Sequence, residues 1–182
     1  MAAVAIIGDG PGGLSAALFL ARNGHQAVVY GMDKTAMNFA YLYNYLGIPE
    51  IDGSEFQKVA REQVLAFGAA IVEEEVTAVS ADDGYTVTSE SGTASFDYLV
   101  FSEGRNPELA RSLGLAVDES GAIVVNREYA SSLFGVYAVG RSARPERSQA
   151  IISAGAGATA ALDILALEAG ENVTDWDSPA EN

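Results

Sequence analysis

The segment Val4–Gly13, which reads VAIIGDGPGG, decides the fold. Its apolar start is typical of a buried β-strand and runs directly into glycines. Apolar residues then recur at helical spacing from Leu14 to Ala21, and Asn23-Gly24 is a helix-ending signal. A second apolar run, Gln26–Tyr30, follows. The order strand, glycine turn, helix, strand predicts an α/β protein with a Rossmann-like FAD/NAD(P)-binding fold and a parallel sheet.

The glycine turn matches the pattern G-x-G-x-x-G. The first glycine permits the tight turn, the second lets the backbone approach a pyrophosphate, and the third lets the helix pack close to the sheet. The N–H groups at the start of the helix and its dipole would face the anion. The turn therefore predicts dinucleotide binding by Gly8, Gly10, Pro11, Gly12 and Gly13, and a purely structural turn is the alternative.

An acidic residue stands where such a site needs one. Asp33 follows the second strand, about twenty residues after Gly13, and a carboxylate there can accept both ribose hydroxyls. The same charge disfavours NADP, because its 2′-phosphate would meet a carboxylate. An acid at position 33 is compatible with both FAD and NAD.

The rest of the chain continues the alternation of helices and strands. Residues 34–49 are expected to be irregular, residues 1–170 to form one domain, and the polar residues 171–182 to be a loose tail. Turn signals between short strands predict a small β-meander. The predicted later elements are a helix with Phe56, Val59, Ala60, Val64 and Phe67 on one face, strands at 70–72, 75–79, 85–89, 94–96, 98–102, 123–125 and 136–139, and a helix from Gln149 to Glu168.

Composition excludes several classes of partner and chemistry. The 182 residues include 25 acidic and 10 basic ones, for a net charge of −15. This charge repels phosphate backbones and anionic lipid, so neither nucleic acid nor a membrane is an expected partner. A halophilic source is the preferred explanation of the charge, and a surface for a basic partner is the alternative. With no cysteine, the chain cannot form a disulfide or a redox dithiol.

The ends and the most apolar helix of the chain indicate a cytoplasmic protein. The N-terminus lacks the basic region and the cleavage site of a signal peptide. The stretch 150–167 is apolar enough to resemble a membrane span, but it is rich in Gly and Ala and contains Ser153, Thr159 and Asp163. We interpret it as a buried helix in which Gly155 and Gly157 permit close packing.

An ordered set of short stretches resembles the thioredoxin reductase family. The resemblance extends to about Leu167, and its specificity comes from the order, because each motif alone is common. The stretches are 4–14, Gly31-Met32-Asp33-Lys34, Asn44-Tyr45-Leu46-Gly47, 61–63, 67–69, 74–77, 97–107, 134–140 and Gln149-Ala150.

The resemblance implies an FAD domain. By position, Asp33 would hold the adenosine ribose, the backbone of Val76 would meet adenine, and Asn44 would lie near the ribityl chain or the flavin. The helix that starts at Gln149-Ala150 would point its N–H groups at the flavin, where they stabilise the charge of the reduced ring. The implied cofactor-binding residues are Gly8, Gly10, Pro11, Gly12, Gly13, Asp33, Lys34, Asn44, Val76, Gly104, Gly140, Arg141, Gln149 and Ala150, with no catalytic residue and no metal ligand.

Two departures from the family limit what the resemblance implies. The family inserts an NADPH domain with a redox Cys pair between the halves of its FAD domain, and here both are missing, so a functional thioredoxin reductase is not expected. The family's Gly-Asp, whose acid binds the ribityl chain, is replaced by Gly140-Arg141, and an arginine only donates hydrogen bonds. Arg141, Arg144 and Arg147 are either solvated loop residues or part of an altered cofactor contact or anion site.

Two functions follow from these observations. The preferred one is a flavoprotein oxidoreductase whose FAD takes electrons from free NAD(P)H or from a redox protein partner. The alternative is a non-catalytic module that binds FAD, NAD or an adenine nucleotide as a structural or sensory ligand. The aromatic run Phe39–Tyr45 is expected either to stack on the flavin, to pack as a strand or to form a subunit contact. The substrate, and whether the chain is a homodimer, stay open.

Overall fold

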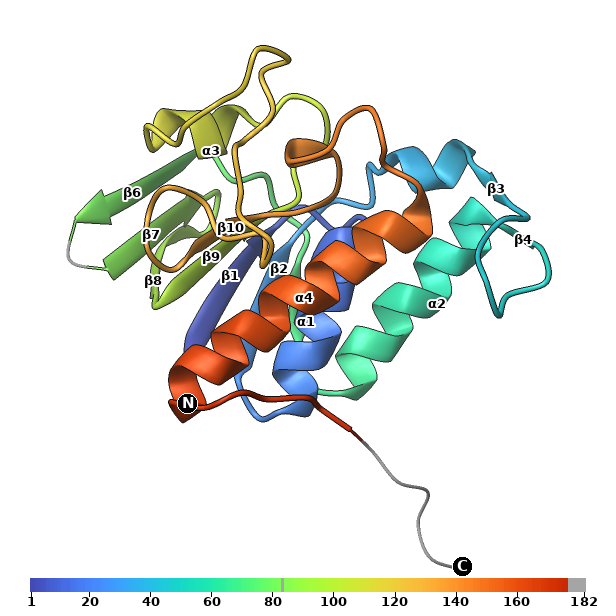
Figure 1. Cartoon of the computed structure of the whole chain (residues 1–182), viewed down its shortest axis with the longest axis horizontal. Helices are drawn as coiled ribbons and strands as arrows, with labels where there is room; N and C mark the ends of the chain where they lie inside the picture. The colour runs from blue at the N-terminus through green and yellow to red at the C-terminus, as the bar shows by residue number, and fades with distance from the viewer. Residues whose placement is uncertain (83, 177–182) are drawn as a thin grey trace, which may run out of the picture.

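The protein is built around a five-stranded parallel sheet, seen in a computed structural model that describes residues 1–82 and 84–176 (Figure 1). The strand order is β10-β9-β1-β2-β5, so the chain leaves β1 toward one edge and later returns to extend the sheet on the other side. The predicted Rossmann-like parallel sheet is confirmed. The strands are β1 Ala3–Ile7, β2 Gln26–Tyr30, β5 Ala70–Val72, β9 Tyr98–Phe101 and β10 Val136–Ala138.

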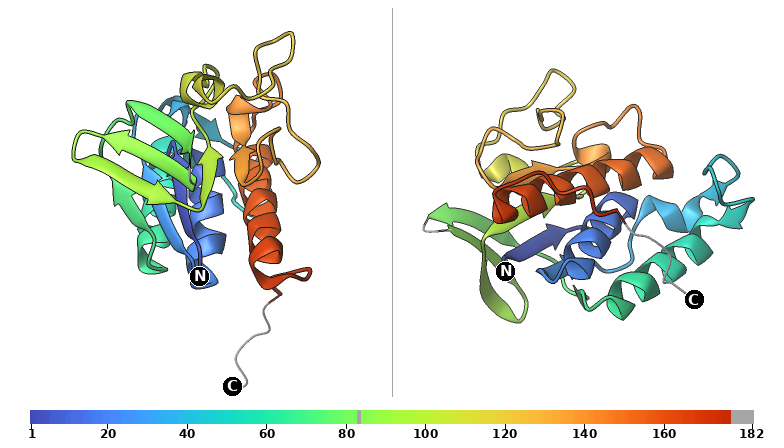
Figure 2. Two further views of the ribbon diagram at one scale, coloured as in Figure 1. Left: turned by 90° about the vertical axis from the view of Figure 1, so that its left-hand side faces the viewer. Right: turned by 60° about the horizontal axis from the view of Figure 1, so that its bottom comes forward.

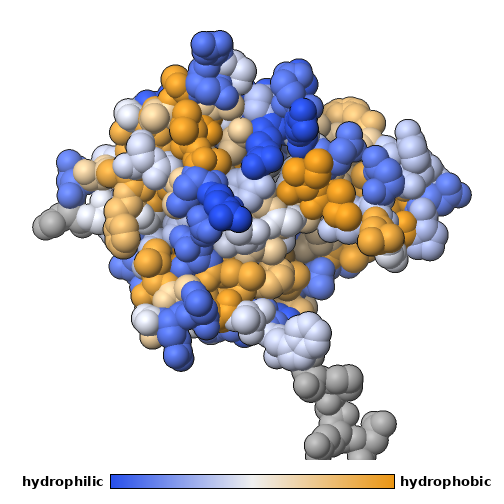
Figure 3. All heavy atoms as spheres, in the orientation of Figure 1, coloured by the Kyte–Doolittle hydropathy of each residue, from blue (hydrophilic) through white to orange (hydrophobic). Residues whose placement is uncertain are grey.

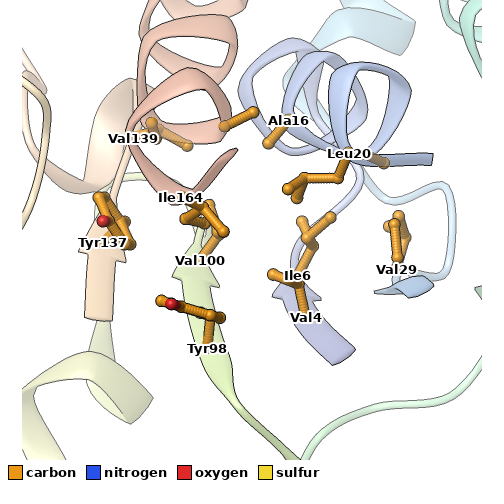
Figure 4. Close-up of a cluster of buried hydrophobic side chains, with 14 of the residues drawn as sticks. Val4, Ile6, Ala16, Leu20, Val29, Tyr98, Val100, Tyr137, Val139 and Ile164 are labelled. Carbon is orange, nitrogen blue, oxygen red and sulfur yellow. The ribbon is translucent and has the colours of Figure 1, made fainter. Parts of the chain in front are cut away.

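Three helices cover one face of the sheet: α1 Pro11–Arg22, α2 Gly53–Ala66 and α4 Ala150–Ala169. Every second residue of the strands points into this layer, so Val4 and Ile6 pack beneath the helices. The two views of Figure 2 show α1 and α4 side by side on the sheet, and Figure 4 shows their side chains meeting those of the strands.

The packing of α1 on α4 depends on one glycine. A Cβ at Gly157 would lie 2.0 Å from the carbonyl oxygen of Gly12, so only glycine lets the two helices approach this closely. A Cβ at Gly155 would meet nothing within 4 Å. Both glycines were expected to permit close packing of the helix on the sheet; instead Gly157 permits close packing on α1, and Gly155 has no packing role.

Helix α4 is long and apolar enough to cross a membrane by length and composition. In this fold it packs on α1 and the sheet, and Ala156, Ala160 and Ile164 are buried there. Figure 3 shows apolar atoms on the face of the molecule that carries α4. The exposed apolar side chains of the helix are Ile151, Ile152 and Leu167.

The opposite face of the sheet carries a β-meander and a short helix. The meander is antiparallel and consists of β6 Ala78–Asp82, β7 Gly84–Ser89 and β8 Gly92–Phe96. It buries Val87 and Phe96 against alternate residues of the parallel strands. The predicted meander is confirmed, although its first strand begins later than expected.

The segment between β2 and α2 contains only short elements, as predicted. They are the 3₁₀ turn η1 Ala36–Phe39 and the antiparallel pair β3 Tyr41–Leu42 and β4 Ile51–Asp52. This pair forms a small lobe beside the N-terminal end of α2 (Figure 1).

Some expected elements differ in the structure. Residues 123–125 do not form a strand, because Ile123 makes only an isolated bridge to Val117. The short helix α3 Glu108–Ser112 was not predicted. The expected apolar face of α2 is only partly covered: Val64 is buried and Phe56 and Ala60 pack against core residues, but Val59 is about half exposed. Phe67, also about half exposed, is the C-cap residue of the helix.

The start of the C-terminal segment is attached to the body of the protein. Val173 packs against the helical layer, and Asp175 accepts a hydrogen bond from Asn23 Nδ2 at 3.1 Å. Arg22 lies 3.8 Å from the same carboxylate. The loose tail was expected to span residues 171–182; residues 173 and 175 make these contacts, and residues 177–182 lie outside the described residues.

Candidate functional site

A pocket of about 550 Å³ opens at the carboxyl ends of the parallel strands. It lies beside β1 and β9, where the strand order reverses, and open α/β sheets bind their ligands at this point. Four segments form its walls: the glycine turn, residues 34–44, residues 102–104 after β9, and the turn η2 Gly140–Ser142 with the start of α4.

The glycines of the turn have the steric roles that the pattern predicts. Gly8 has a φ of 104°, and a Cβ there would lie 2.2 Å from the carbonyl oxygen of Ser102. A Cβ at Gly13 would lie 2.0 Å from the carbonyl oxygen of Gly8. A Cβ at Gly10, by contrast, would have only the Thr35 hydroxyl, at 3.5 Å, and the Ser102 hydroxyl, at 4.0 Å, within 4 Å. Gly8 and Gly13 shape the turn, while Gly10 keeps the pocket wall open.

The start of α1 leaves an amide available to a ligand. The amide of Gly13 donates to Ser102 Oγ at 3.2 Å, and that of Leu14 donates to the carbonyl of Gly10. Within the described part of the chain, the Gly12 N–H has no acceptor. An anion that binds at this helix start would satisfy it.

The other wall brings together two residues that are distant in sequence. Asn44 Nδ2 donates to Gln149 Oε1 at 3.1 Å, and Gln149 is the N-cap residue of α4. The first amides of α4 thus open on the same pocket as the glycine turn. Ala150 is buried beneath them against Met37 and Leu42.

Arg141 lies in η2 and lines the pocket. Its Nε is buried, and no residue that the structure describes accepts a hydrogen bond from it. Its neighbours differ: Arg144 lies over the ring of Tyr129 at 5.5 Å, and Arg105 is 4.0 Å from Glu146. The arginines that follow η2 are exposed loop residues, whereas Arg141 presents a charged donor to the site.

Glu103, in the segment that follows β9, adds an acid to the pocket wall. Its carboxylate accepts the amides of Leu109 and Ala110, at 2.9 and 3.0 Å, and so caps α3. Burial raises the pKa of Glu103, and the two amide hydrogen bonds oppose this shift. No motif in the sequence pointed to this residue.

Most of the predicted cofactor residues meet in this pocket. Three do not line it: Gly13 packs inside the turn, Val76 is buried beneath the meander, and Asp33 is exposed outside the wall with a φ of 55°. Their assigned contacts with a cofactor stay predictions. The predicted residues that line the pocket are Gly8, Gly10, Pro11, Gly12, Lys34, Asn44, Gly104, Gly140, Arg141, Gln149 and Ala150.

The aromatic run has more than one environment. Tyr41 and Tyr43 line the pocket, and their rings lie 6.5 Å apart. Tyr45 packs on Phe56 instead, with 5.5 Å between ring centroids. Phe39 is 94% exposed. Stacking on a ligand is therefore open to Tyr41 and Tyr43 and not to the whole run.

The polar residues beneath the glycine turn were also missed. Asp9 is only 5% exposed and contacts Arg61 in a buried ion pair, while Gln57 donates to the carbonyl oxygen of Asp9 at 2.6 Å. An acid inside a glycine turn was the available signal, since such a residue needs a partner when it is buried. Among the described residues, no group of three or more His, Cys, Asp or Glu could hold a metal ion.

The family model described as pyridine nucleotide-disulphide oxidoreductase matches residues 48–158. The chain belongs to this family. It is 28% identical over 162 residues to an alkyl hydroperoxide reductase subunit of Staphylococcus epidermidis. That alignment covers 88% of this chain but 30% of the relative, so the chain spans about a third of the length of the curated relatives it matches.

Solved structures confirm the fold. A thioredoxin reductase from Gloeobacter violaceus has a TM-score of 0.89 at 16% identity, over 97% of this chain and 99% of the other. The thioredoxin reductase of T. acidophilum has a TM-score of 0.82 at 16% identity, over 92% and 99% of the two chains. The resemblance to thioredoxin reductases noted from the sequence is therefore confirmed.

Members of this family are FAD-binding flavoproteins, which confirms FAD as the cofactor predicted from the sequence. The pocket fits this group at both ends. The unpaired Gly12 amide suits a pyrophosphate, and the start of α4 suits the polar edge of a flavin. Arg141 can donate to a phosphate or a hydroxyl oxygen, although it cannot accept a hydrogen bond from a hydroxyl as a carboxylate would.

Proposed function

We propose that this chain holds FAD non-covalently across the pocket and acts as the flavin domain of an oxidoreductase. One observation carries the proposal: the start of α1 and the start of α4, which are far apart in sequence, open on the same pocket. FAD contains an anionic pyrophosphate and a flavin that becomes electron-rich on reduction. Each of these two parts is stabilised by a helix N-terminus.

In this proposal the chain binds and orients, and the bound flavin supplies the electron-transfer chemistry. The glycine turn and the Gly12 amide bind the pyrophosphate. The first amides of α4 and Arg141 place positive potential at the other end of the pocket. Tyr41 and Tyr43, which line the pocket, provide aromatic rings that can stack on the ligand.

We propose that the electrons come from free NAD(P)H or from a separate redox protein. The sequence contains no cysteine, so this chain cannot itself form the thiolate that attacks a disulfide. With NADPH and the FAD-loaded chain, the reduction of DTNB should not exceed the rate without protein. Turnover above that rate, in protein free of contaminating reductase, would contradict this part of the proposal.

The first experiment is reconstitution. Purified protein mixed with FAD and then desalted should keep the visible absorption of oxidised flavin. At a free FAD concentration of a hundred times Kd, the protein should gain about 2.7 kcal/mol of stability, which a thermal melt detects as a higher Tm. Riboflavin, which lacks the pyrophosphate and adenosine, is the matched control ligand and should bind much more weakly. Failure of micromolar FAD to bind or to raise Tm would refute the proposal.

A second candidate function is favoured by Arg141. Because a cation occupies the position of the family's ribityl-binding acid, the site could hold a nucleotide as a structural or sensory ligand without redox cycling. Arg141 Nε is buried without a partner, and this is what a phosphate oxygen would satisfy. The two functions differ in their response to substitution of Arg141.

We also propose a halophilic and cytoplasmic origin for the protein. A net charge of −15 favours hydration in concentrated salt, where the repulsion between carboxylates is screened. The Tm of the purified protein should therefore rise as KCl is increased from about 0.1 M, where the Debye length is about 10 Å, to 1 M. A Tm that falls or stays constant over this range would count against the salt-adapted interpretation.

A further inference from the structure

A buried ion pair lies directly beneath the glycine turn. Asp9 and Arg61 contact each other with side chains that are only 6% and 14% exposed. The second amino group of Arg61 pairs with Glu73, which is 72% exposed and therefore screened by water. Space for the Asp9 side chain exists because residue 31 is glycine: a Cβ there would lie 2.4 Å from Asp9 Cβ.

The same carboxylate reaches the end of β2. Asp9 Oδ2 accepts the backbone amide of Asp33 at 2.9 Å. Asp33 has a left-handed φ of 55°, a conformation that non-glycine residues adopt at a cost and that a fixed hydrogen bond can hold. Asn38 Nδ2 binds the other side of Asp33, at 2.6 Å from its carbonyl oxygen. Asp33 is thus clamped between the glycine turn and η1.

We propose that Asp9 and Arg61 form a positioning pair for the adenosine end of the ligand. Asp9 holds the backbone of Asp33 so that its carboxylate faces the ribose and rejects a 2′-phosphate. Arg61 neutralises Asp9, which would otherwise place an unpaired charge beside the pyrophosphate. This inference rests on the proposed function, since it assumes that a dinucleotide occupies the glycine turn.

Two double variants isolate the hydrogen bond to Asp33. Asp9→Asn/Arg61→Gln removes both charges but keeps an oxygen that can accept the Asp33 amide. Asp9→Ser/Arg61→Gln also removes both charges, and its side chain is too short to reach that amide. Neither leaves a buried ion unpaired, so both are expected to fold, which a cooperative thermal melt checks.

The readout is the ratio of Kd for adenosine 2′,5′-bisphosphate to Kd for AMP, measured by calorimetry. A general weakening of nucleotide binding raises both Kd values and leaves their ratio unchanged. Asp9→Asn/Arg61→Gln should keep the wild-type ratio within about threefold, whereas Asp9→Ser/Arg61→Gln should lower it about tenfold. Equal ratios in the two folded variants would overturn the proposal.

Asp33→Asn supplies the second half of the test. If Asp9 acts through Asp33, this substitution lowers the ratio by itself, and adding Asp9→Ser/Arg61→Gln to it causes no further decrease. Independent, multiplicative decreases would show that Asp9 does not act through Asp33, and the proposal would fail.

The neutralising role of Arg61 has its own signature. Arg61→Gln alone leaves a buried carboxylate beside the anion site, so AMP, the bisphosphate and FAD should all bind about tenfold more weakly with an unchanged ratio. Asp9→Asn/Arg61→Gln should restore their affinities. If wild-type protein does not bind FAD, the proposed function fails first; if it binds FAD and these patterns are absent, only the positioning pair is refuted.

Discussion

The glycine turn and the turn η2, which line the same pocket, differ in how far the protein satisfies its own polar groups. At the glycine turn the amide of Gly8 donates to Tyr30, that of Gly13 donates to Ser102, and Asp9 pairs with Arg61. In η2, within the residues that the structure describes, Arg141 Nε is buried without a partner.

This difference distinguishes a preformed part of the site from a part that its ligand completes. Buried polar groups are almost always hydrogen-bonded, and leaving a donor unpaired costs about 1–3 kcal/mol. The glycine turn leaves the Gly12 amide to a ligand but holds its shape through its own hydrogen bonds, whereas the buried charged donor of Arg141 gains an acceptor only from a ligand. Substitutions at the glycine turn should act mainly on stability, and those at Arg141 mainly on affinity.

The largest effect is expected where α4 supports the glycine turn. Gly157→Ala places a Cβ against the carbonyl oxygen of Gly12 and should lower the free energy of unfolding by about 3 kcal/mol. Gly155→Ala is the matched control on the same helix, and it should raise stability by about 0.5–1 kcal/mol because its Cβ meets open space. Urea denaturation measures both. Equal effects of the two substitutions would show that α1 and α4 do not approach as described.

A smaller loss of stability is expected from removing the hydrogen bonds that join the sheet to α4. Tyr137 donates to Asp163 at 2.6 Å and is almost fully buried, and Tyr98 donates to Glu168 at 2.9 Å. Tyr137→Phe leaves Asp163 without this donor and should cost about 1–3 kcal/mol of stability. Tyr98→Phe, whose partner Glu168 is 29% exposed, should cost less because water replaces the hydroxyl. A larger loss of stability for Tyr98→Phe than for Tyr137→Phe would contradict the deeper burial of the Tyr137–Asp163 hydrogen bond.

The smallest expected effect is a pH dependence of the protein's stability that is caused by Glu103. Burial raises the pKa of Glu103 in the folded protein above its ordinary value of 4.5. The folded state then binds the proton more tightly than the unfolded state. The contribution of Glu103 to stability therefore falls as pH rises from the ordinary value of 4.5 through the raised pKa of the folded state. Glu103→Gln should flatten this decrease, which urea denaturation at a series of pH values measures. An unchanged slope would show that Glu103 does not titrate in this way.

The sequence predicted what depends on local pattern. Periodicity and glycine spacing identified the parallel strands, α1, α4 and the pyrophosphate turn, because these signals are set by neighbouring residues. The failures have a common cause. Residues 123–125 have a strand-like composition but no continuous partner strand, and Val59 has helical spacing but is about half exposed. Pairing and coverage are tertiary properties that the local pattern does not contain.

The candidate site shows the same division. Its predicted lining follows from motifs, whereas Asp9 and Ser102 act through contacts with distant segments, and Glu103 caps a helix that was not predicted. Asp9 occupies a variable position of the glycine pattern, so only its burial and its pairing with Arg61 reveal it. Asp33, in contrast, was selected from the sequence but lies outside the pocket lining, and its contact with the ribose stays a prediction.

Two arginine variants separate the flavoenzyme from the nucleotide-binding module. Arg141→Asp restores the residue that the family has, so it should bind FAD at least as well as Arg141→Ala if the chain is a flavoenzyme. If the true ligand is an adenine nucleotide bound through Arg141, the added negative charge should abolish its binding instead. Titrations of both variants with FAD, NAD and AMP distinguish the two.

The central claim is that the ligand supplies the hydrogen-bond acceptor that Arg141 lacks. Its most direct test is to measure the Kd of FAD for wild-type protein, for Arg141→Ala and for the control Arg144→Ala. A charge-assisted hydrogen bond contributes about 1.5–3 kcal/mol, so Arg141→Ala should weaken FAD binding about tenfold or more with little change in Tm of the free protein. Arg144→Ala, which removes a side chain stacked on Tyr129, should leave the Kd unchanged. Equal Kd values for all three proteins would show that Arg141 does not contact the ligand and would contradict the account.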